Sequence, residues 1–299
     1  MTRIVCVGHA AFDTIFRVAS IPSAPTKVLA TGYLECGGGM AANASVAAAR
    51  LGGEAHYWGR VGNDALGAKI LAQLEGEGVN VDIVRRIDGS ISPTTAVLVA
   101  DDGARLICTY NDPSLDADPS WLPLAAIARF DVVLADVRWP AGSAQVLDEA
   151  RNAGIPAVLD GDVGAVDVIR DLCHRADYTV FSEAGLSAAS GVVDPGRGLR
   201  YAQDLTRGIV GVTLGQDGFL WLEGGVERHL TAPTVSAVDT LAAGDIFHGA
   251  FALCIGERSS VADAARFANA AAAIKCTRPG GRLGAPSRAE VEAFLSERA

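Results

Sequence analysis

Short β-prone runs alternate with alanine- and leucine-rich amphipathic stretches along most of this 299-residue chain, and alanine-rich helices close it. Such alternation predicts an α/β fold, a doubly wound and mostly parallel sheet with helices on both faces. Ligands of these sheets bind outside the carboxyl ends of the strands, so the polar residues there are the candidate site. The expected strands are residues 3–8, 55–62, 131–137, 156–162, 177–182, 208–215 and 218–225, and the expected helices are residues 41–53, 66–79 and 142–155.

Two segments interrupt this alternation. Residues 12–36 have strand propensity without an intervening helix, and residues 94–111 are typical of a hairpin that turns at Asp102-Gly103. We expect the two segments to form a small antiparallel sheet that covers the site as a lid. The chain has no linker rich in proline or serine and no internal repeat, which predicts a single domain over residues 1–299 with this lid.

Composition and charge exclude several classes of function. The chain is 49% hydrophobic and 20% charged, as globular proteins are, and its net charge of −10 speaks against a nucleic-acid partner. Its apolar runs are too short for a signal peptide or a membrane span. The six cysteines form no CxxC pair and most lie in apolar stretches. We therefore expect a soluble cytoplasmic protein, in which an anionic substrate would need a local positive pocket.

The run "DTLAAGD" at residues 239–245 carries the strongest chemical signal. Ala242, Ala243 and Gly244 are small, so they leave the first amides of the following helix open to an anion. We expect the helix dipole to lower the pKa of Asp245 and keep it ionised near pH 7. An ionised carboxylate beside an anion site can remove the proton from an alcohol that attacks phosphorus. For a lone aspartate the alternative is a helix cap.

Further stretches are weaker signals of ligand binding. The run "ECGGGMAANAS" at 35–45 and the turn "VTLGQDG" at 212–218 allow close approach of the backbone to a ligand. Three cations, Lys275, Arg278 and Arg282, surround a double glycine and suggest a local phosphate pocket, with a solvated basic helix end as the alternative. The five histidines have no metal-ligand spacing, and His248 is interpreted as a packing residue or a local hydrogen-bond partner.

Together these motifs resemble the PfkB, or ribokinase-like, family of carbohydrate kinases over essentially the whole chain. In family order they are Asp13 after the first strand, "GGGMAAN", "GRVGNDALG", "VTLGQDG" and "DTLAAGDIFHGAFA". The resemblance implies a doubly wound domain with a β-sheet lid and transfer of phosphate from MgATP to a sugar hydroxyl. ATP and Mg²⁺ are thus the expected cofactors and a small sugar the expected partner. A monovalent cation is a further possible cofactor. The family often forms homodimers through the lid.

The resemblance also assigns roles to individual residues. Asp245 would be the general base, and the amides of Ala242, Ala243, Gly244 and Asp245 would form the anion hole. The family's Asn-x-x-Glu magnesium motif is degenerate here, which leaves Glu183 as the candidate metal ligand. Residues that would bind the sugar are Asp13, Gly38, Gly39 and Asn43, and those that would bind ATP are Thr213, Gly215, Gly218, Asn269, Lys275 and Gly280.

A closer resemblance is to the sulfofructose kinases within this family, through the runs at 131–139, 158–162 and 275–282. These enzymes phosphorylate the 1-hydroxyl of 6-deoxy-6-sulfofructose, and Lys27 and Arg138 would then bind the sulfonate. Thr109 stands where the subgroup has asparagine, and Asn111 lies two places on, so both are further substrate-binding candidates. The alternative for Arg138 is a structural pairing with Asp136 or Asp160. The alternative substrates are fructose, a phosphosugar or another neutral sugar or nucleoside, and the alternative function is a non-catalytic sugar-binding regulator.

Overall fold

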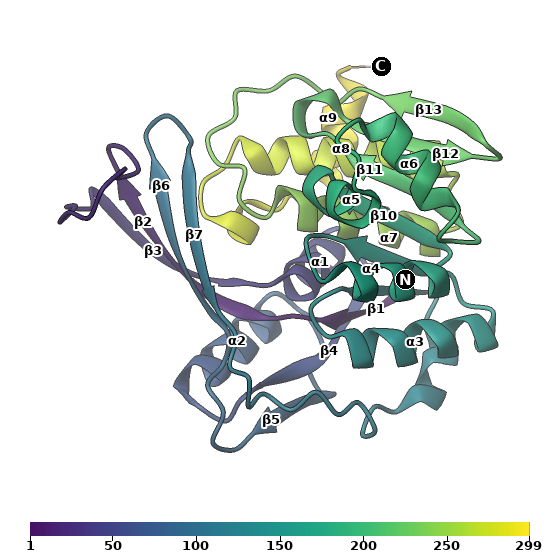
Figure 1. Ribbon diagram of the computed structural model, residues 1–299, viewed down its shortest axis with the longest axis horizontal. Helices are drawn as coiled ribbons and strands as arrows, with labels where there is room; N and C mark the ends of the chain where they lie inside the picture. The colour runs from purple at the N-terminus through teal and green to yellow at the C-terminus, as the bar shows by residue number, and fades with distance from the viewer. Residues whose placement is uncertain (299) are drawn as a thin grey trace.

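A computed structural model describes residues 1–298 and contains one large and one small β-sheet (Figure 1). The strands of the large sheet are β1 (Arg3–Gly8), β4 (Glu54–Gly62), β5 (Val84–Ile87), β8 (Val132–Asp136), β9 (Ala157–Gly161), β10 (Tyr178–Ser182), β11 (Ile209–Thr213), β12 (Phe219–Glu223) and β13 (Val226–Leu230). Their order is β13-β12-β11-β10-β9-β8-β1-β4-β5. All neighbours are parallel except β11–β12 and β12–β13. The predicted mostly parallel sheet is thus confirmed.

Helices cover both faces of the large sheet. One face carries α1 (Met40–Arg50), α2 (Ala65–Gly76), α7 (Ala243–Gly256), α8 (Val261–Cys276) and α9 (Arg288–Ser296), and the other carries α3 (Pro140–Ala153), α4 (Val166–Arg175), α5 (Glu183–Ser190) and α6 (Pro195–Gln203). Side chains of β1 alternate between the two cores, since Ile4 and Cys6 join the first and Val5 and Val7 the second. This period of two is why the central strands are apolar on both faces over most of their length.

Helices α1 and α7 approach each other closely. A Cβ built on Gly249 of α7 would lie 2.3 Å from the carbonyl oxygen of Ala44 in α1, so only glycine fits at that contact. Every residue of α7 from Ile246 to Ile255 is buried. This packing fixes the N-termini of both helices beside the carboxyl ends of β1, β8 and β9, which is where the candidate site lies.

The lid consists of β2 (Ala11–Val18), β3 (Gly32–Gly38), β6 (Thr94–Ala100) and β7 (Arg105–Tyr110), in the order β3-β2-β6-β7. Figure 1 shows this sheet projecting from one side of the body. Two pairings are antiparallel, as expected, but the central pair β2–β6 is parallel. The chain returns to the body between β3 and β6, so β6 leaves it in the same direction as β2 does.

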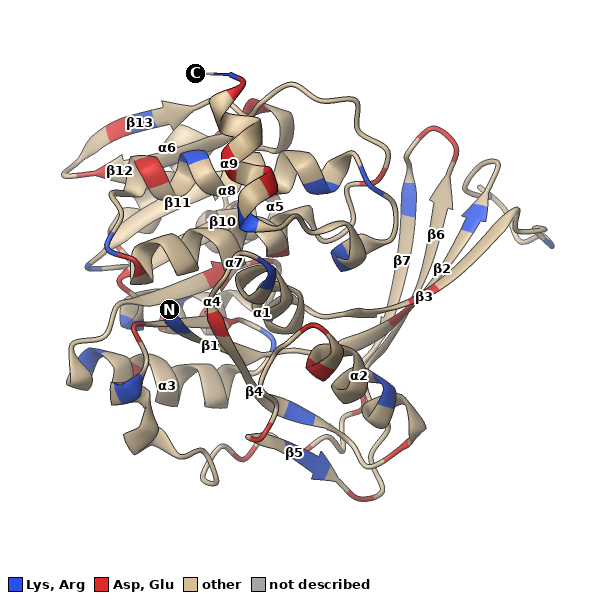
Figure 2. Ribbon diagram, turned by 180° about the vertical axis from the view of Figure 1, so that it is seen from behind, with Lys and Arg blue, Asp and Glu red and all other residues tan. Residues whose placement is uncertain are grey.

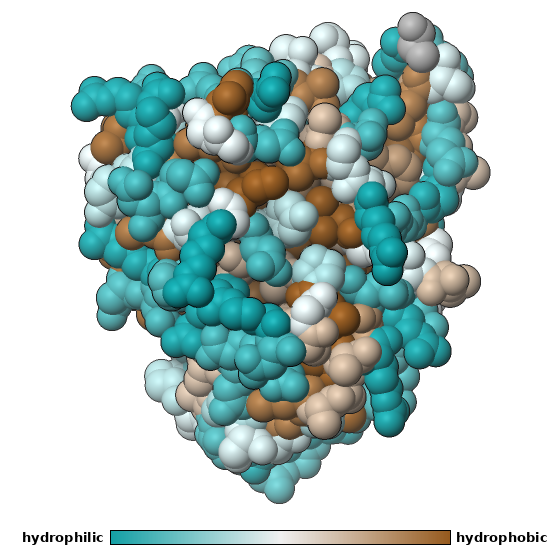
Figure 3. All heavy atoms as spheres, turned by 90° about the vertical axis from the view of Figure 1, so that its right-hand side faces the viewer, coloured by the Kyte–Doolittle hydropathy of each residue, from teal (hydrophilic) through white to brown (hydrophobic). Residues whose placement is uncertain are grey.

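Charges of both signs lie close together on the side of the molecule seen in Figure 2. Figure 2 shows lysine and arginine interspersed with aspartate and glutamate over the outer helices and loops. On the side away from the lid, apolar side chains gather in a central band bordered by hydrophilic ones (Figure 3). No helix within residues 1–298 is long and apolar enough to cross a membrane.

Candidate active site

Asn43 and Asp245 meet at the junction of α1 and α7. Nδ2 of Asn43 donates to Oδ2 of Asp245 over 2.6 Å, although the two residues are 202 positions apart. Asn43 is buried, and its Oδ1 has no hydrogen-bond partner among the described residues. A buried amide oxygen without a partner costs free energy unless a ligand supplies a donor. The pair can therefore hold a hydroxyl group between a carboxylate and an amide oxygen.

The protonation of Asp245 differs from the sequence-based expectation. The helix dipole was expected to lower its pKa, but burial raises the pKa of Asp245 to about 7. The hydrogen bond from Asn43 opposes this effect, whereas the nearby carboxylates of Asp162, Asp13 and Asp136 reinforce it. A carboxylate with a pKa near neutrality can both accept and return a proton at physiological pH, as a general base must.

The start of α7 has the geometry of an anion hole. Ala242 precedes the helix with φ 63°, a left-handed conformation that is rare for residues other than glycine. Within residues 1–298 the amides of Gly244 and Asp245 have no protein acceptor, and a Cβ built on Gly244 would meet no atom within 4 Å. Ala243 donates to the carbonyl of Thr240 over 3.3 Å and is the weaker candidate donor. The open amides can receive a negatively charged oxygen.

Asp13 lies on the lid, in a row of polar side chains that crosses three strands. Asp13 pairs in register with Thr95, and Thr95 with Thr109, whose hydroxyl lies 3.4 Å from that of Thr95. Burial raises the pKa of Asp13 to about 6. A Cβ on Gly38 would lie 2.2 Å from the Asp13 carboxylate, which explains why β3 ends in glycine.

The neighbouring Gly39 has φ 92°, and a Cβ there would lie 2.6 Å from the Cα of Ala10. Both glycines are thus required by close packing around Asp13 and the start of α1. The lid row, Asn43, Asp245 and the open amides of α7 all come from segments that meet at the carboxyl ends of the central strands.

The whole chain is similar to known sugar kinases. Residues 1–288 match the model of the pfkB family of carbohydrate kinases. The chain belongs to this family. It is 30% identical to the ribokinase of Bacillus subtilis, with 99% of this chain and 100% of that protein covered.

Solved structures agree with this assignment. The crystal structure of a "putative ribokinase" from Agrobacterium tumefaciens has a TM-score of 0.96 and 39% identity, covering 99% of this chain and 98% of that one. Arabidopsis thaliana ribokinase, solved with ribose and ATP, has a TM-score of 0.86 and 27% identity, covering 99% of both chains. The protein is thus an ATP-dependent carbohydrate kinase.

Four of the six residues expected to bind ATP cluster at the β11–β12 turn. Thr213 ends β11, and Gly215 and Gly218 form the turn with φ of 56° and 94°. Asn269 of α8 reaches the same place, since its Nδ2 donates to the carbonyl of Leu230 over 3.3 Å. A Cβ on Gly218 would lie 2.0 Å from that carbonyl, whereas Gly215 faces open space. This kinase therefore has an open glycine turn next to α8 that can accommodate a nucleotide.

The expected phosphate pocket of three cations is wrong. Lys275 is completely buried, and its Nζ donates to the carbonyl of Asp239 over 2.6 Å and lies 3.4 Å from the Asp239 carboxylate. Arg282 is also buried and donates to Gln73, while Arg278 pairs with Glu290 on the surface. The three cations thus have separate protein partners and do not converge on one ligand.

The Asp239–Lys275 pair instead stabilises the loop that leads to the anion hole. Oδ2 of Asp239 accepts the amides of Gly280 and Gly281 over 2.8 and 3.0 Å, and Oδ1 accepts the amide of Leu241 over 2.8 Å. Gly280 thus contacts Asp239 through its amide. Lys275 and Gly280 support this loop, and their contact with ATP stays a prediction.

No metal cluster supports Glu183 as a magnesium ligand. Glu183 begins α5, where Ser182 caps the helix and donates to Asp162 over 2.7 Å. Residues 1–298 contain no group of three acidic, histidine or cysteine side chains that could hold a metal ion. Mg²⁺ keeps several waters and is commonly bound through substrate phosphates, so a dedicated protein cage is not required.

Arg138 and Lys27 lie in different parts of the chain. Arg138 follows β8 in the body, whereas Lys27 lies in the exposed connection between β2 and β3, at the outer end of the lid (Figure 1). One chain therefore does not bring the two expected sulfonate ligands together. Thr109 lies in the lid row, and Asn111 is exposed just beyond the end of β7.

The proposed structural pairing of Arg138 is only partly correct. Its backbone amide donates to Asp136, but its side chain lies 3.8 Å from Asp162 and is 39% exposed.

Two further basic side chains, His9 and Arg60, lie near Arg138. Burial, followed by the charges of Arg138 and Arg60, lowers the pKa of His9 to about 4. Arg60 stacks on Trp139, with its guanidinium carbon 4.5 Å from the ring centroid.

Sequence reasoning missed Asp136 as an organiser of this edge. This fully buried carboxylate accepts the amides of His9, Ala41 and Arg138 over 2.7, 3.1 and 2.8 Å. It thereby joins the ends of β1 and β8 to the start of α1. Its position as the last residue of an apolar strand was the available signal.

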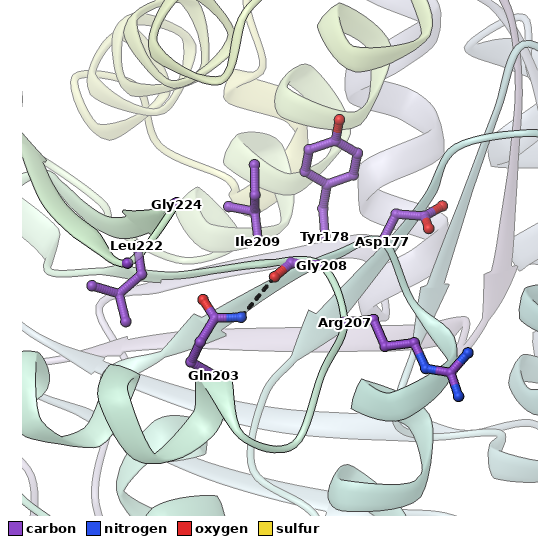
Figure 4. A pocket seen from close by; sticks show the side chains of 9 residues that line it. Asp177, Tyr178, Gln203, Arg207, Gly208, Ile209, Leu222 and Gly224 are labelled. Carbon is purple, nitrogen blue, oxygen red and sulfur yellow. Dashed lines mark hydrogen bonds between the residues drawn. The ribbon is translucent and has the colours of Figure 1, made fainter.

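A hollow of about 420 Å³ lies at the opposite edge of the large sheet. Figure 4 shows Asp177, Tyr178 and Ile209 at the start of β10 and β11, with Gln203 donating to the carbonyl of Gly208 over 2.9 Å. This edge holds the amino ends of the strands, away from Asp245. The hollow is therefore not part of the candidate active site.

Proposed function

We propose that this kinase transfers the γ-phosphoryl group of ATP to a primary hydroxyl of a ketose that carries a fixed negative charge. The first candidate is 6-deoxy-6-sulfofructose, which would yield its 1-phosphate. The observation that carries the proposal is the cationic corner, which we define as Arg60, Arg138 and the neutral ring of His9. The charges of Arg138 and Arg60 both act on His9, so this corner offers an anion two guanidinium groups in a chain of net charge −10.

The chemistry follows from the groups at the start of α7. Asp245 accepts the proton of the sugar hydroxyl while Asn43 holds the carboxylate in place. The new bond joins the hydroxyl oxygen to the γ-phosphorus, the bond from that phosphorus to the bridging oxygen breaks, and ADP leaves with the electron pair. The open amides of Gly244 and Asp245 bind the oxygens on which charge develops.

The remaining residues are proposed to bind the two substrates. Asp13 and Thr109 of the lid row would accept and donate hydrogen bonds to the other sugar hydroxyls, with Asn111 at its open end. Thr213, Gly215, Gly218 and Asn269 would accommodate the nucleotide. When bound, Mg²⁺ would neutralise charge on the phosphates, held through them and water.

The cationic corner is suited to a tetrahedral or planar anion. Arg138 has one distant carboxylate partner, at 3.8 Å, and is partly exposed, so its guanidinium can bind a ligand oxygen. Charge-assisted hydrogen bonds contribute about 1.5–3 kcal/mol each, or about 10- to 150-fold in specificity. Lys27 lies in the exposed connection between β2 and β3, so the proposal rests on Arg138 and Arg60.

A substrate panel with an Arg138 variant tests the proposal. ADP release is measured with 6-deoxy-6-sulfofructose, fructose, fructose phosphates, tagatose phosphates and ribose. We expect R138M to lower kcat/KM for the preferred charged sugar by about 10- to 100-fold and to leave fructose almost unaffected. The matched control is D162N, which removes the carboxylate partner of Arg138 but keeps the cation.

Equal losses with charged and neutral sugars in R138M would refute the anion assignment and indicate a structural role for Arg138. A preference of the native enzyme for fructose or ribose would identify a neutral-sugar kinase. Sugar binding without ADP release would indicate a regulator.

The lid also supports a proposal of homodimerisation. All residues of β7 are exposed, and Leu106, Ile107 and Tyr110 are each about half exposed. Such an apolar edge strand is unusual in a monomer unless a partner covers it. We expect light scattering to give twice the monomer mass and I107E to give the monomer. A native monomer at micromolar concentration would exclude this interface.

A further inference from the structure

A buried histidine lies directly behind the catalytic carboxylate. Nδ1 of His248 is 2.7 Å from the carbonyl oxygen of Gly244, and Nε2 is 3.1 Å from the carbonyl oxygen of Val180. Nε2 is also 3.4 Å from Oδ1 of Asp160. Both ring nitrogens therefore face oxygen atoms, whereas a neutral imidazole has a single N–H to donate. A second proton, on the ring or on the Asp160 carboxyl that faces Nε2, would satisfy both ring nitrogens.

Within residues 1–298, the carboxyl group of Asp160 also lacks a hydrogen-bond partner at one oxygen. It is buried on β9, and its Oδ2 has no partner among the described residues. Burial, and next the charge of Asp245, raise the pKa of Asp160 well above its ordinary value. Burial lowers the pKa of His248. Both shifts disfavour an isolated charge on either residue.

The surroundings of Asp160 are strongly acidic. Asp245 of α7, Asp162 after β9 and Asp136 of β8 all raise its pKa, and Arg138 is the cation that opposes them. Asp13 of the lid adds to the same field at Asp245, where Asn43 supplies a neutral donor. A full negative charge on Asp160 would make the loss of the Asp245 proton still more difficult.

We propose that Asp160 and His248 share one proton and together form an uncharged pair that tunes the catalytic carboxylate. In one arrangement the ring carries both protons and Asp160 is a carboxylate. In the other, Asp160 is protonated and donates to Nε2, while Nδ1–H donates to Gly244. The net charge is zero in both, so the titration belongs to the pair and not to either member.

The pair has two effects on the reaction, and this inference rests on the proposed function. It removes one negative charge beside Asp245, which allows that residue to ionise near neutral pH. It also holds the carbonyl of Gly244, whose peptide group includes the Asp245 amide of the anion hole. His248 and Asp160 are thus positioning residues, because they act through Asp245 and the helix start.

The kinetic test is the pH dependence of kcat/KM in three variants. D160N leaves a neutral imidazole beside a neutral amide, so the charge next to Asp245 is unchanged. The midpoint of the acid limb of kcat/KM is therefore expected to stay in place. H248F leaves Asp160 to compete with Asp245 for a proton, so the midpoint is expected to rise by about one pH unit or more. The double variant D160N/H248F removes that competing charge, and the midpoint is expected to return to the native value.

A purely structural role for His248 would not be rescued by D160N. A fall of the midpoint in D160N by a unit or more would show that Asp160 is a net anion in the native enzyme and would overturn the proposal. A rise of the midpoint in H248F that the double variant does not reverse would overturn it as well. If H248F does not fold, D160N alone still decides the charge of the pair.

A second measurement is independent of any kinase activity. In protein labelled with ¹⁵N-histidine, the ring signals of His248, assigned by their absence in H248F, are followed between about pH 5.5 and pH 8.5. The proposal predicts no titration of these signals. A midpoint between about 6 and 7 would show that the pair changes charge and would refute it, even for a protein that phosphorylates none of the sugars tested.

Discussion

Replacing Lys275 with methionine should both destabilise the fold and slow phosphoryl transfer. The Lys275 side chain is completely buried and contacts both the carbonyl and the carboxylate of Asp239. Removing one partner of a buried ion pair costs about 3–5 kcal/mol. Asp239 keeps three amide donors, from Leu241, Gly280 and Gly281, so we expect the lower end of that range, about 3 kcal/mol.

The free energy of unfolding is measured by urea denaturation, and kcat with saturating substrates. We expect kcat of K275M to fall by about tenfold or more, because the same loop carries the anion hole. The control R278A removes an exposed pair with Glu290 from the same turn and should cost at most about 1 kcal/mol. The double variant D239N/K275M should recover part of the lost stability. A K275M protein as stable and as active as R278A would refute the supporting role of this pair.

Three further predictions concern stability. A242G should raise the free energy of unfolding by up to about 1 kcal/mol in urea, because φ of 63° strains alanine but not glycine; a loss would show that the turn is unstrained. G249A should lower the free energy of unfolding by about 1–3 kcal/mol, because its Cβ would lie 2.3 Å from the Ala44 carbonyl oxygen. The control G76A, whose Cβ would meet no atom within 4 Å, should not lower it. Equal effects would contradict the packing of α1 on α7. The pKa of Asp245 in the folded state, about 7, exceeds its unfolded value, so ionisation costs stability as pH rises from about 4. D245N should therefore be more stable than the native protein at pH 8 by about 2–4 kcal/mol and equal to it near pH 4; equal stability at both would contradict the raised pKa.

Patterns of local sequence predicted most of the fold. Strands β1, β8 and β9 are mostly apolar because both faces are covered, and each appears within one residue of its expected bounds. The parallel β2–β6 pairing was beyond such reasoning, since it depends on where the chain re-enters the lid after about fifty residues in the body. Helices α4, α5 and α6 were also not predicted, because their short apolar stripes lie among polar and glycine residues.

Motifs identified the residues of the candidate site, but the local sequence did not predict the pKa shifts and charge pairs within it. Asn43 and Asp245 were each identified by motif, and the structure joins them. The direction of the Asp245 pKa shift was wrong because the burial of a carboxylate depends on segments far apart in sequence. Lys275 was assigned to a phosphate for the same reason: a sequence shows a cation beside two glycines but not the buried Asp239 that faces it.

The central claim is that Asp245 removes the proton from the sugar hydroxyl. The most direct measurement compares kcat of D245N with that of the native enzyme at pH 8, with ATP binding followed separately by calorimetry. General base catalysis contributes about 10²–10⁴-fold, so we expect a loss of that size with nearly unchanged affinity for ATP. Turnover within a few-fold of the native value would contradict the assignment of Asp245 as the base.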